Sequence, residues 1–160
     1  MDPAIKKQAL RLFTYGLYAV SCTDEGTVNC FTANWLTQVS FEPPLIALSV
    51  ENNSKSLPMI QHSQKCTINV FNSGEEGRKL AGALGKSALR DPQKLQGIAY
   101  TLGANGCPIL RDALGWVACE VRNSIPAGDS TLLLAEVVDA GMLNEGQPLT
   151  MAEVGFRHAG

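Results

Sequence analysis

The segment from Thr27 to Trp35 carries small and polar side chains where an ordinary strand would alternate cleanly between apolar and polar residues. Small residues let a planar ligand lie against the backbone, and Thr32 and Asn34 offer hydrogen-bond donors and acceptors beside it. A half-buried strand with an exposed polar face would show the same composition. The residues alone therefore leave two interpretations open, a site for a flat ligand or a strand without chemistry.

A second candidate is the run Ser54, Lys55 and Ser56, which follows a polar loop and precedes a predicted helix. The free N–H groups of a first helical turn, two hydroxyls and one ammonium group suit a phosphate monoester. Serine is also a common helix cap, which needs no ligand. Phosphate binding and ordinary capping both remain open for this run.

Other catalytic patterns are absent from the sequence. Gly82–Ser87 is similar to a phosphate-binding P-loop, but Leu80 stands where the motif requires its first glycine, so we interpret the segment as a flexible loop. There is no G-x-G-x-x-G and no G-x-S-x-G, and the only histidines are His62 and His158. The five cysteines include no C-x-x-C pair. We therefore expect neither a metal site nor a catalytic triad.

The composition is that of a globular domain. The chain has 160 residues, of which 45% are hydrophobic and 18% charged, and its net charge of −2 arises from mixed signs. We expect one domain over residues 1–160, without a nucleic-acid or membrane partner. Scattered cysteines among apolar neighbours indicate reduced, buried thiols. The first apolar stretch is too interrupted for an export signal, so we expect a cytoplasmic protein.

The chemistry-bearing segments must be positioned by many short strands. Asp2-Pro3 predicts the start of an amphipathic helix that runs to about Phe13, and a second helix is expected to end near Ser63. Residues 74–97 are predicted as mixed helix and loop on an exposed connection, and residues 125–129 as a loop. This pattern favours a mainly β, closed or partly closed antiparallel barrel with two or three short helices. The predicted strands are residues 17–23, 27–34, 36–41, 45–50, 65–71, 114–123 and 131–144.

In order along the chain, these segments resemble the flavin reductase family of the FMN-binding split barrel. The resemblance covers most of the chain and is closest to the flavin reductase modules of diiron flavoproteins and high-molecular-weight rubredoxins. It implies an antiparallel, Greek-key split β-barrel. The matching landmarks are Thr32–Ile46, Asn53–Ser56, Thr67–Phe71, Gly106–Leu110 and Gly128–Leu132.

The resemblance further implies an FMN-binding oxidoreductase, with FAD as an alternative flavin and NADH or NADPH as a transient electron donor. Such proteins are usually homodimers, and the electrons pass on to flavin, oxygen or a redox partner protein. Hydride transfer between two stacked rings requires no protein nucleophile, which agrees with the missing triad. The implied cofactor-binding residues are Asn29, Cys30, Phe31, Thr32, Ala33, Asn34, Trp35, Gln38, Ser40, Ser54, Lys55 and Ser56.

One position departs from the family pattern. The family commonly has Gly-Asp-His where this chain has Gly128, Asp129 and Ser130, and that histidine often lies near the flavin or the nicotinamide. Ser130 therefore stands at the family's histidine position, and no catalytic side chain is assigned with certainty. The substitution motivates an alternative function, an FMN-binding electron carrier without nicotinamide activity. A barrel that binds another planar ligand is a third hypothesis.

Overall fold

The structure is a computed structural model and describes residues 1–156. Four helices and nine strands are assigned in this part of the chain. The helices are α1 (Pro3–Leu10), α2 (Ser56–Ser63), α3 (Glu75–Leu84) and α4 (Met151–Val154). The strands are β1 (Tyr18–Asp24), β2 (Thr27–Ala33), β3 (Leu36–Ser40), β4 (Leu45–Glu51), β5 (Lys65–Val70), β6 (Tyr100–Leu102), β7 (Pro108–Leu110), β8 (Gly115–Ala127) and β9 (Ser130–Met142).

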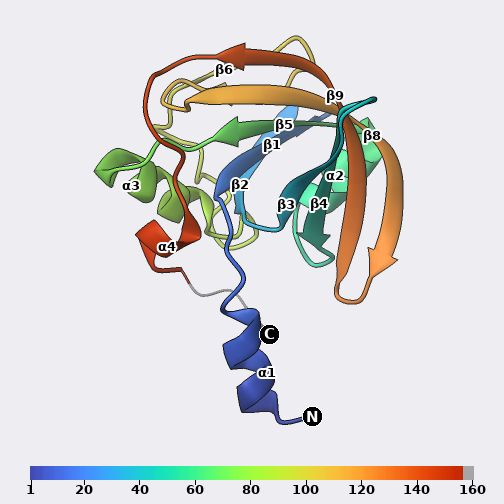
Figure 1. Ribbon diagram of the computed structural model, residues 1–160. Helices are drawn as coiled ribbons and strands as arrows, with labels where there is room; N and C mark the ends of the chain where they lie inside the picture. The colour runs from blue at the N-terminus through green and yellow to red at the C-terminus, as the bar shows by residue number, and fades with distance from the viewer. Residues whose placement is uncertain (157–160) are drawn as a thin grey trace.

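Seven strands form one curved antiparallel sheet in the order β2-β1-β5-β8-β9-β4-β3, and β6 pairs separately with β7 (Figure 1). The two edge strands, β2 and β3, are consecutive along the chain. The pairing of β3 with β4 continues one residue beyond the strand, because the amide of Ser49 donates to the carbonyl of Trp35 at 3.0 Å. The predicted mainly β split barrel is confirmed, and the sheet stays open between its edges.

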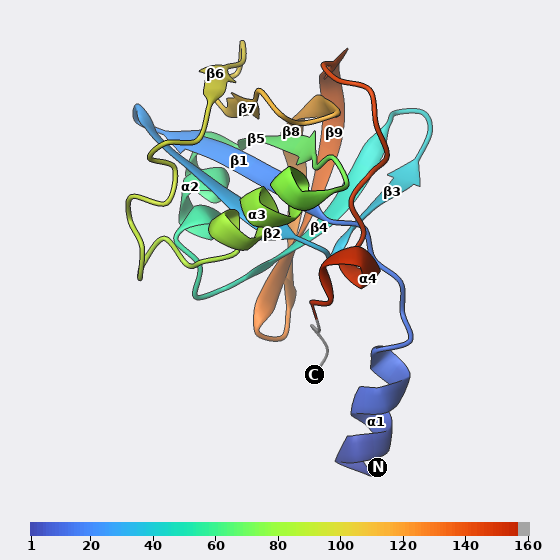
Figure 2. The same ribbon diagram turned by 90° about the vertical axis from the view of Figure 1, so that its left-hand side faces the viewer.

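Two apolar clusters lie on opposite faces of the sheet. The cluster inside the curve joins β1, β4, β5, β8 and β9 to Leu57, Met59 and Ile60 of α2. On the other face α3 lies against β1 and β2 (Figure 2), where Ala81 and Leu84 are fully buried. Both faces of β1 and β2 are thus covered, so β2 presents a fixed edge to whatever binds beside it.

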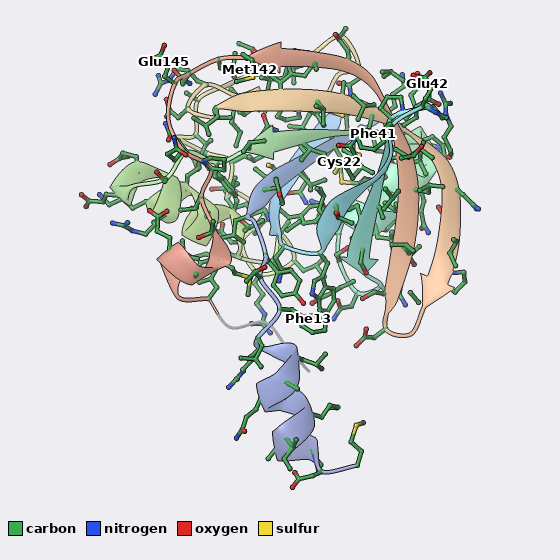
Figure 3. The ribbon with its side chains drawn as sticks, viewed as in Figure 1. Phe13, Cys22, Phe41, Glu42, Met142 and Glu145 are labelled. Atoms are coloured by element: carbon green, nitrogen blue, oxygen red, sulfur yellow. The ribbon has the colours of Figure 1, made fainter. Side chains whose placement is uncertain are left out.

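Helix α1 begins as predicted but packs against nothing in the described chain. The Asp2 carboxylate accepts hydrogen bonds from the first amides, and Pro3 occupies the first helical position. The helix ends at Leu10 rather than at the predicted Phe13, because tighter i to i−3 hydrogen bonds follow from Leu12 onward. None of its residues is buried. It projects from the barrel, with Phe13 at its base (Figure 3).

The prediction of a loop over residues 125–129 is wrong. Strand β8 continues to Ala127, and Ile125 pairs with Leu132 of β9 across a tight turn in which Gly128 has a φ of 66°. Proline at position 126 suggested a break, yet the neighbouring strand β5 pairs with β8 only as far as Glu120. Pro126 therefore stands where one side of β8 has no partner and no N–H is required.

The five cysteines are buried free thiols, as predicted. Figure 3 shows Cys22 inside the curve of the sheet. Burial is the largest cause that raises the pKa of Cys22 to about 12 and that of Cys107 to about 11. No helix within residues 1–156 is long and apolar enough to cross a membrane.

Candidate functional site

A groove of about 770 Å³ opens where β2, the end of β4, the start of α2 and the segment after α3 meet. Its size is in the range of small-molecule sites. The side chains that line it come from five separate stretches of the chain, so the groove exists only in the folded protein. Nine of the predicted cofactor-binding residues line it, namely Asn29, Phe31, Thr32, Ala33, Asn34, Trp35, Ser54, Lys55 and Ser56.

Strand alternation divides the residues of β2 between two environments. Phe31 and Ala33 lie on the side of the inner cluster, whereas Cys30 belongs to the cluster beneath α3. Thr32 also faces α3, because its hydroxyl donates to the carbonyl of Ala81 at 2.6 Å. This bond fixes α3 against the strand and therefore holds one wall of the groove at a set distance from the other.

A buried polar pair joins β2 to the start of α2. The Asn29 amide nitrogen donates to the Ser56 hydroxyl at 2.7 Å, and the two residues are 5% and 2% exposed. A hydrogen bond between buried groups is costly to leave unmade, so the pair fixes the position of α2 relative to the strand. Both residues also line the groove, and they therefore position the cationic loop that contains Lys55 beside it.

The start of α2 combines the two interpretations that the sequence left open. The Ser54 hydroxyl accepts from the Leu57 amide at 3.2 Å, which is ordinary capping. The Lys55 side chain is half-buried in the groove wall. The capping bond thus orders the loop, and Lys55 supplies a positive charge that an anionic ligand group could use.

Four predicted residues do not line the groove. Cys30 is fully buried under α3, and burial raises its thiol pKa. Gln38 and Ser40 lie on the edge strand β3, where the Gln38 amide donates to the Ser40 carbonyl at 3.1 Å. Ser130 is 3% exposed at the start of β9 and its hydroxyl donates to Asp129 at 3.2 Å. Ser130 pairs across the strands with Glu51, which does line the groove.

Sequence reasoning missed the wall formed by the end of α3 and the residues after it. The stretch from Gly82 to Arg90 lines the groove together with Lys94, Met151 and Phe156. The sequence predicts a flexible loop over Gly82–Ser87 and an exposed connection over residues 74–97, but Leu84 and Lys94 are 0% and 7% exposed. The glycines and cations in this connection were the available signal. They were set aside because the segment does not match the P-loop motif.

The residues of the groove fit a flavin nucleotide. Phe31 and Trp35 give it aromatic surface, while Lys55 at the start of α2 suits a phosphate. At Gly82 a Cβ atom would meet nothing within 4 Å, so this wall leaves room for a ring. Residues 1–156 hold no cluster of three or more His, Cys, Asp or Glu side chains that could bind a metal ion.

A curved antiparallel sheet, open beside a groove that aromatic and cationic side chains line, defines a split barrel. The chain belongs to the flavin reductase like domain family, which matches residues 10–160. It is 32% identical over 146 residues to a high molecular weight rubredoxin from Moorella thermoacetica, covering 91% of this chain and 63% of that protein, less than two thirds of its length.

Two further comparisons agree with this membership. The chain is 30% identical over 152 residues to the NADH-dependent flavin reductase StyB from Pseudomonas fluorescens, covering 93% of this chain and 85% of that protein. A solved flavin reductase domain protein from Arthrobacter sp. FB24 superposes with a TM-score of 0.83 at 22% identity, covering 93% of this chain and 90% of that one. The second likeness concerns the fold alone.

Proposed function

We propose that the protein is an NAD(P)H-dependent flavin reductase that binds FMN in the groove. The observation that carries this proposal is that nine residues predicted from separate sequence segments line one groove in a member of the flavin reductase like domain family. The similarity to a relative named NADH-dependent flavin reductase supports the nicotinamide donor. A bound flavin would supply the redox chemistry by accepting a hydride from the dihydronicotinamide.

The residues of this chain would bind and orient the ligands. In our proposal Phe31, Asn34 and Trp35 flank the flavin ring, and Ser54, Lys55 and Ser56 hold its phosphate. The hydrogen bond from Thr32 to Ala81 and that from Asn29 to Ser56 keep the two walls of the groove at a fixed separation. Positioning of this kind is the main contribution that a protein makes to a hydride transfer between two rings.

We also propose that the protein works as a cytoplasmic homodimer and passes electrons to flavin, oxygen or a protein acceptor. The buried free thiols support a reducing compartment. Residues 122–129 of the β8–β9 hairpin are exposed on both faces, which suits contact with a second copy. Similarity to a high molecular weight rubredoxin supports a protein acceptor.

The test is the visible spectrum of purified protein after loading with FMN and desalting, followed by anaerobic addition of NADH or NADPH. Retained flavin bands that bleach with either nucleotide are the expected result. Loss of all flavin on desalting, with no binding of FMN or FAD by fluorescence titration, would overturn the proposal. Size-exclusion chromatography of the same sample gives the oligomeric state.

A second function, an FMN electron carrier without nicotinamide activity, is favoured by one observation. Ser130 is buried, bonded to Asp129 and absent from the groove lining, so it offers no group to a nicotinamide there. Flavin bands that persist with both nucleotides but respond to a one-electron donor would identify the carrier.

A further inference from the structure

The wall of the groove that follows α3 carries positive charge that the flavin phosphate does not account for. Four cationic side chains line the groove, and Glu51 is the one acidic side chain among its described lining residues. The whole chain carries a net charge of −2, so this concentration of cations is local. A groove of one sign attracts anions of the other, and more than one phosphate can be held there. The four cations are Lys55, Lys86, Arg90 and Lys94.

Lys94 is a structural clamp. Its ammonium group donates to the carbonyls of Leu84 and Lys86 at 3.1 and 2.8 Å, and the residue is 7% exposed. Burial lowers its pKa. One bond ends on the last residue of α3 and the other on the segment that follows it, so together they fold residues 84–94 back onto the end of α3. The clamp thereby positions the side chain of Lys86 on the rim of the groove.

Lys86 and Arg90 remain available for a ligand. Both are exposed and line the groove, and neither takes part in any ion pair found among residues 1–156. They stand on the segment that follows α3, whereas Lys55 stands at the start of α2. Two sets of cations from different elements are therefore present along one groove.

The turn between these two cations places an apolar side chain beside them. The Ser87 hydroxyl accepts from the Leu89 amide at 3.3 Å, and the Ser87 carbonyl accepts from the Arg90 amide at 3.0 Å. Leu89 is 66% exposed although it lines the groove. An open apolar surface next to a guanidinium group suits an adenine base that carries phosphates, because the base covers the apolar surface and the phosphates pair with the cations.

We propose that residues 85–90 bind the ADP half of the nicotinamide dinucleotide, with Lys86 and Arg90 on its phosphates and Leu89 under its adenine. This inference rests on the proposed reductase function and deepens it, since it separates the donor's phosphate site from that of the flavin at Lys55. Interactions with this remote half of the donor would hold the nicotinamide ring in place for transfer.

The test compares the double variant Lys86→Gln/Arg90→Gln with wild type and with Lys79→Gln, a control on the exposed face of α3. ADP-ribose binding is measured by calorimetry on the FMN-loaded proteins, and KM is measured for NADH, NADPH and reduced nicotinamide mononucleotide. We expect the double variant to raise the ADP-ribose Kd and the KM for NADH about tenfold or more, because charge-assisted hydrogen bonds are lost. The KM for the mononucleotide should change less than twofold, as should every constant of the control.

The results of this experiment distinguish failure of the inferred ADP site from failure of the proposed reductase function. Unchanged ADP-ribose binding in the double variant would overturn the inference while leaving the reductase intact. A tenfold weaker FMN affinity in the same variant would also overturn it, because the cations would then serve the flavin. Tight, charge-dependent ADP-ribose binding without any flavin bleaching would support the nucleotide site and contradict the proposed reductase function. A larger loss for NADPH than for NADH would support the inference and place the 2′-phosphate on these cations.

Discussion

Replacement of Gly77 by alanine should loosen α3 from the barrel. A Cβ atom at this position would overlap the carbonyl oxygen of Asn72, well inside the 3.0 Å that side-chain carbons keep from their neighbours. The obstacle is backbone, so the first turn of α3 must move. That movement strains the hydrogen bonds from the Arg78 amide to Gly74 and from the Gly74 amide to Glu153. The loss is therefore larger than that of a typical surface substitution.

The magnitude follows from three contributions. Overpacking costs about 1–3 kcal/mol, and two weakened hydrogen bonds cost about 1 kcal/mol each. The higher helix propensity of alanine stabilises the folded protein by about 1 kcal/mol. We expect a net loss of about 2–4 kcal/mol in the free energy of unfolding, which lowers Tm by about 4–16 °C in a chain of this size.

The assay is urea unfolding followed by circular dichroism, with Gly82→Ala as the matched control. Gly82 lies in the same helix, but a Cβ there meets no atom within 4 Å. Its substitution should raise stability by about 0.5–1 kcal/mol, while the added methyl group enters the groove and weakens FMN binding. Equal effects of the two substitutions on stability would refute the reasoning.

Three other predictions concern single side chains. Thr32→Val should cost about 0.5–1.5 kcal/mol by urea unfolding, because it removes one of the two hydrogen bonds to the Ala81 carbonyl and leaves only that from the Gly85 amide, and Thr32→Ser should restore most of that loss. Ser130→His should destabilise the protein by about 1–3 kcal/mol, since an imidazole must enter a site that is 3% exposed; an unchanged Tm would contradict this. Burial raises the pKa of Cys22 from 9.0 to about 12, so the folded thiol keeps its proton at a pH where the unfolded thiol loses it. Its contribution to stability is complete below pH 9 and declines from about pH 9 to pH 12, and the stability difference between wild type and Cys22→Ala should shrink over that interval in urea titrations.

Much of the sheet could be predicted because its strands carry their own signals. The apolar run of β4 is paired on both sides, and the turn around Gly26 joins β1 to β2 as expected. Most predicted boundaries lie within one or two residues of the observed ones. The exception was the end of β8, where Pro126 is tolerated because no strand beside it accepts a hydrogen bond from that position. Local sequence could not show that the neighbouring strand had already ended.

The candidate site was predictable only in part, for a similar reason. The residues of β2 and of the loop before α2 could be found because their composition departs from an ordinary strand or cap. The wall from Gly82 to Arg90 offered only its glycines and cations as a local signal, and its conformation depends on the hydrogen bonds that Lys94 makes to residues eight and ten positions before it. The sequence also could not show that Phe13 is exposed and that α1 has no buried residue, because helical spacing does not reveal whether a partner surface exists.

The order of strands has a consequence for how the protein comes to bind anything. Strands β2 and β3 are neighbours in the chain yet occupy opposite edges of the seven-stranded sheet, and the groove lies beside β2 and the connection that joins it to β3. The groove is complete only when stretches of the chain from Leu17 to Phe156 have come together, and this closes long loops, such as that between β4 and β9. During refolding, ligand capture should therefore be among the last events. A flavin can trap the finished barrel and slow its unfolding, but it cannot act as a template for the early steps.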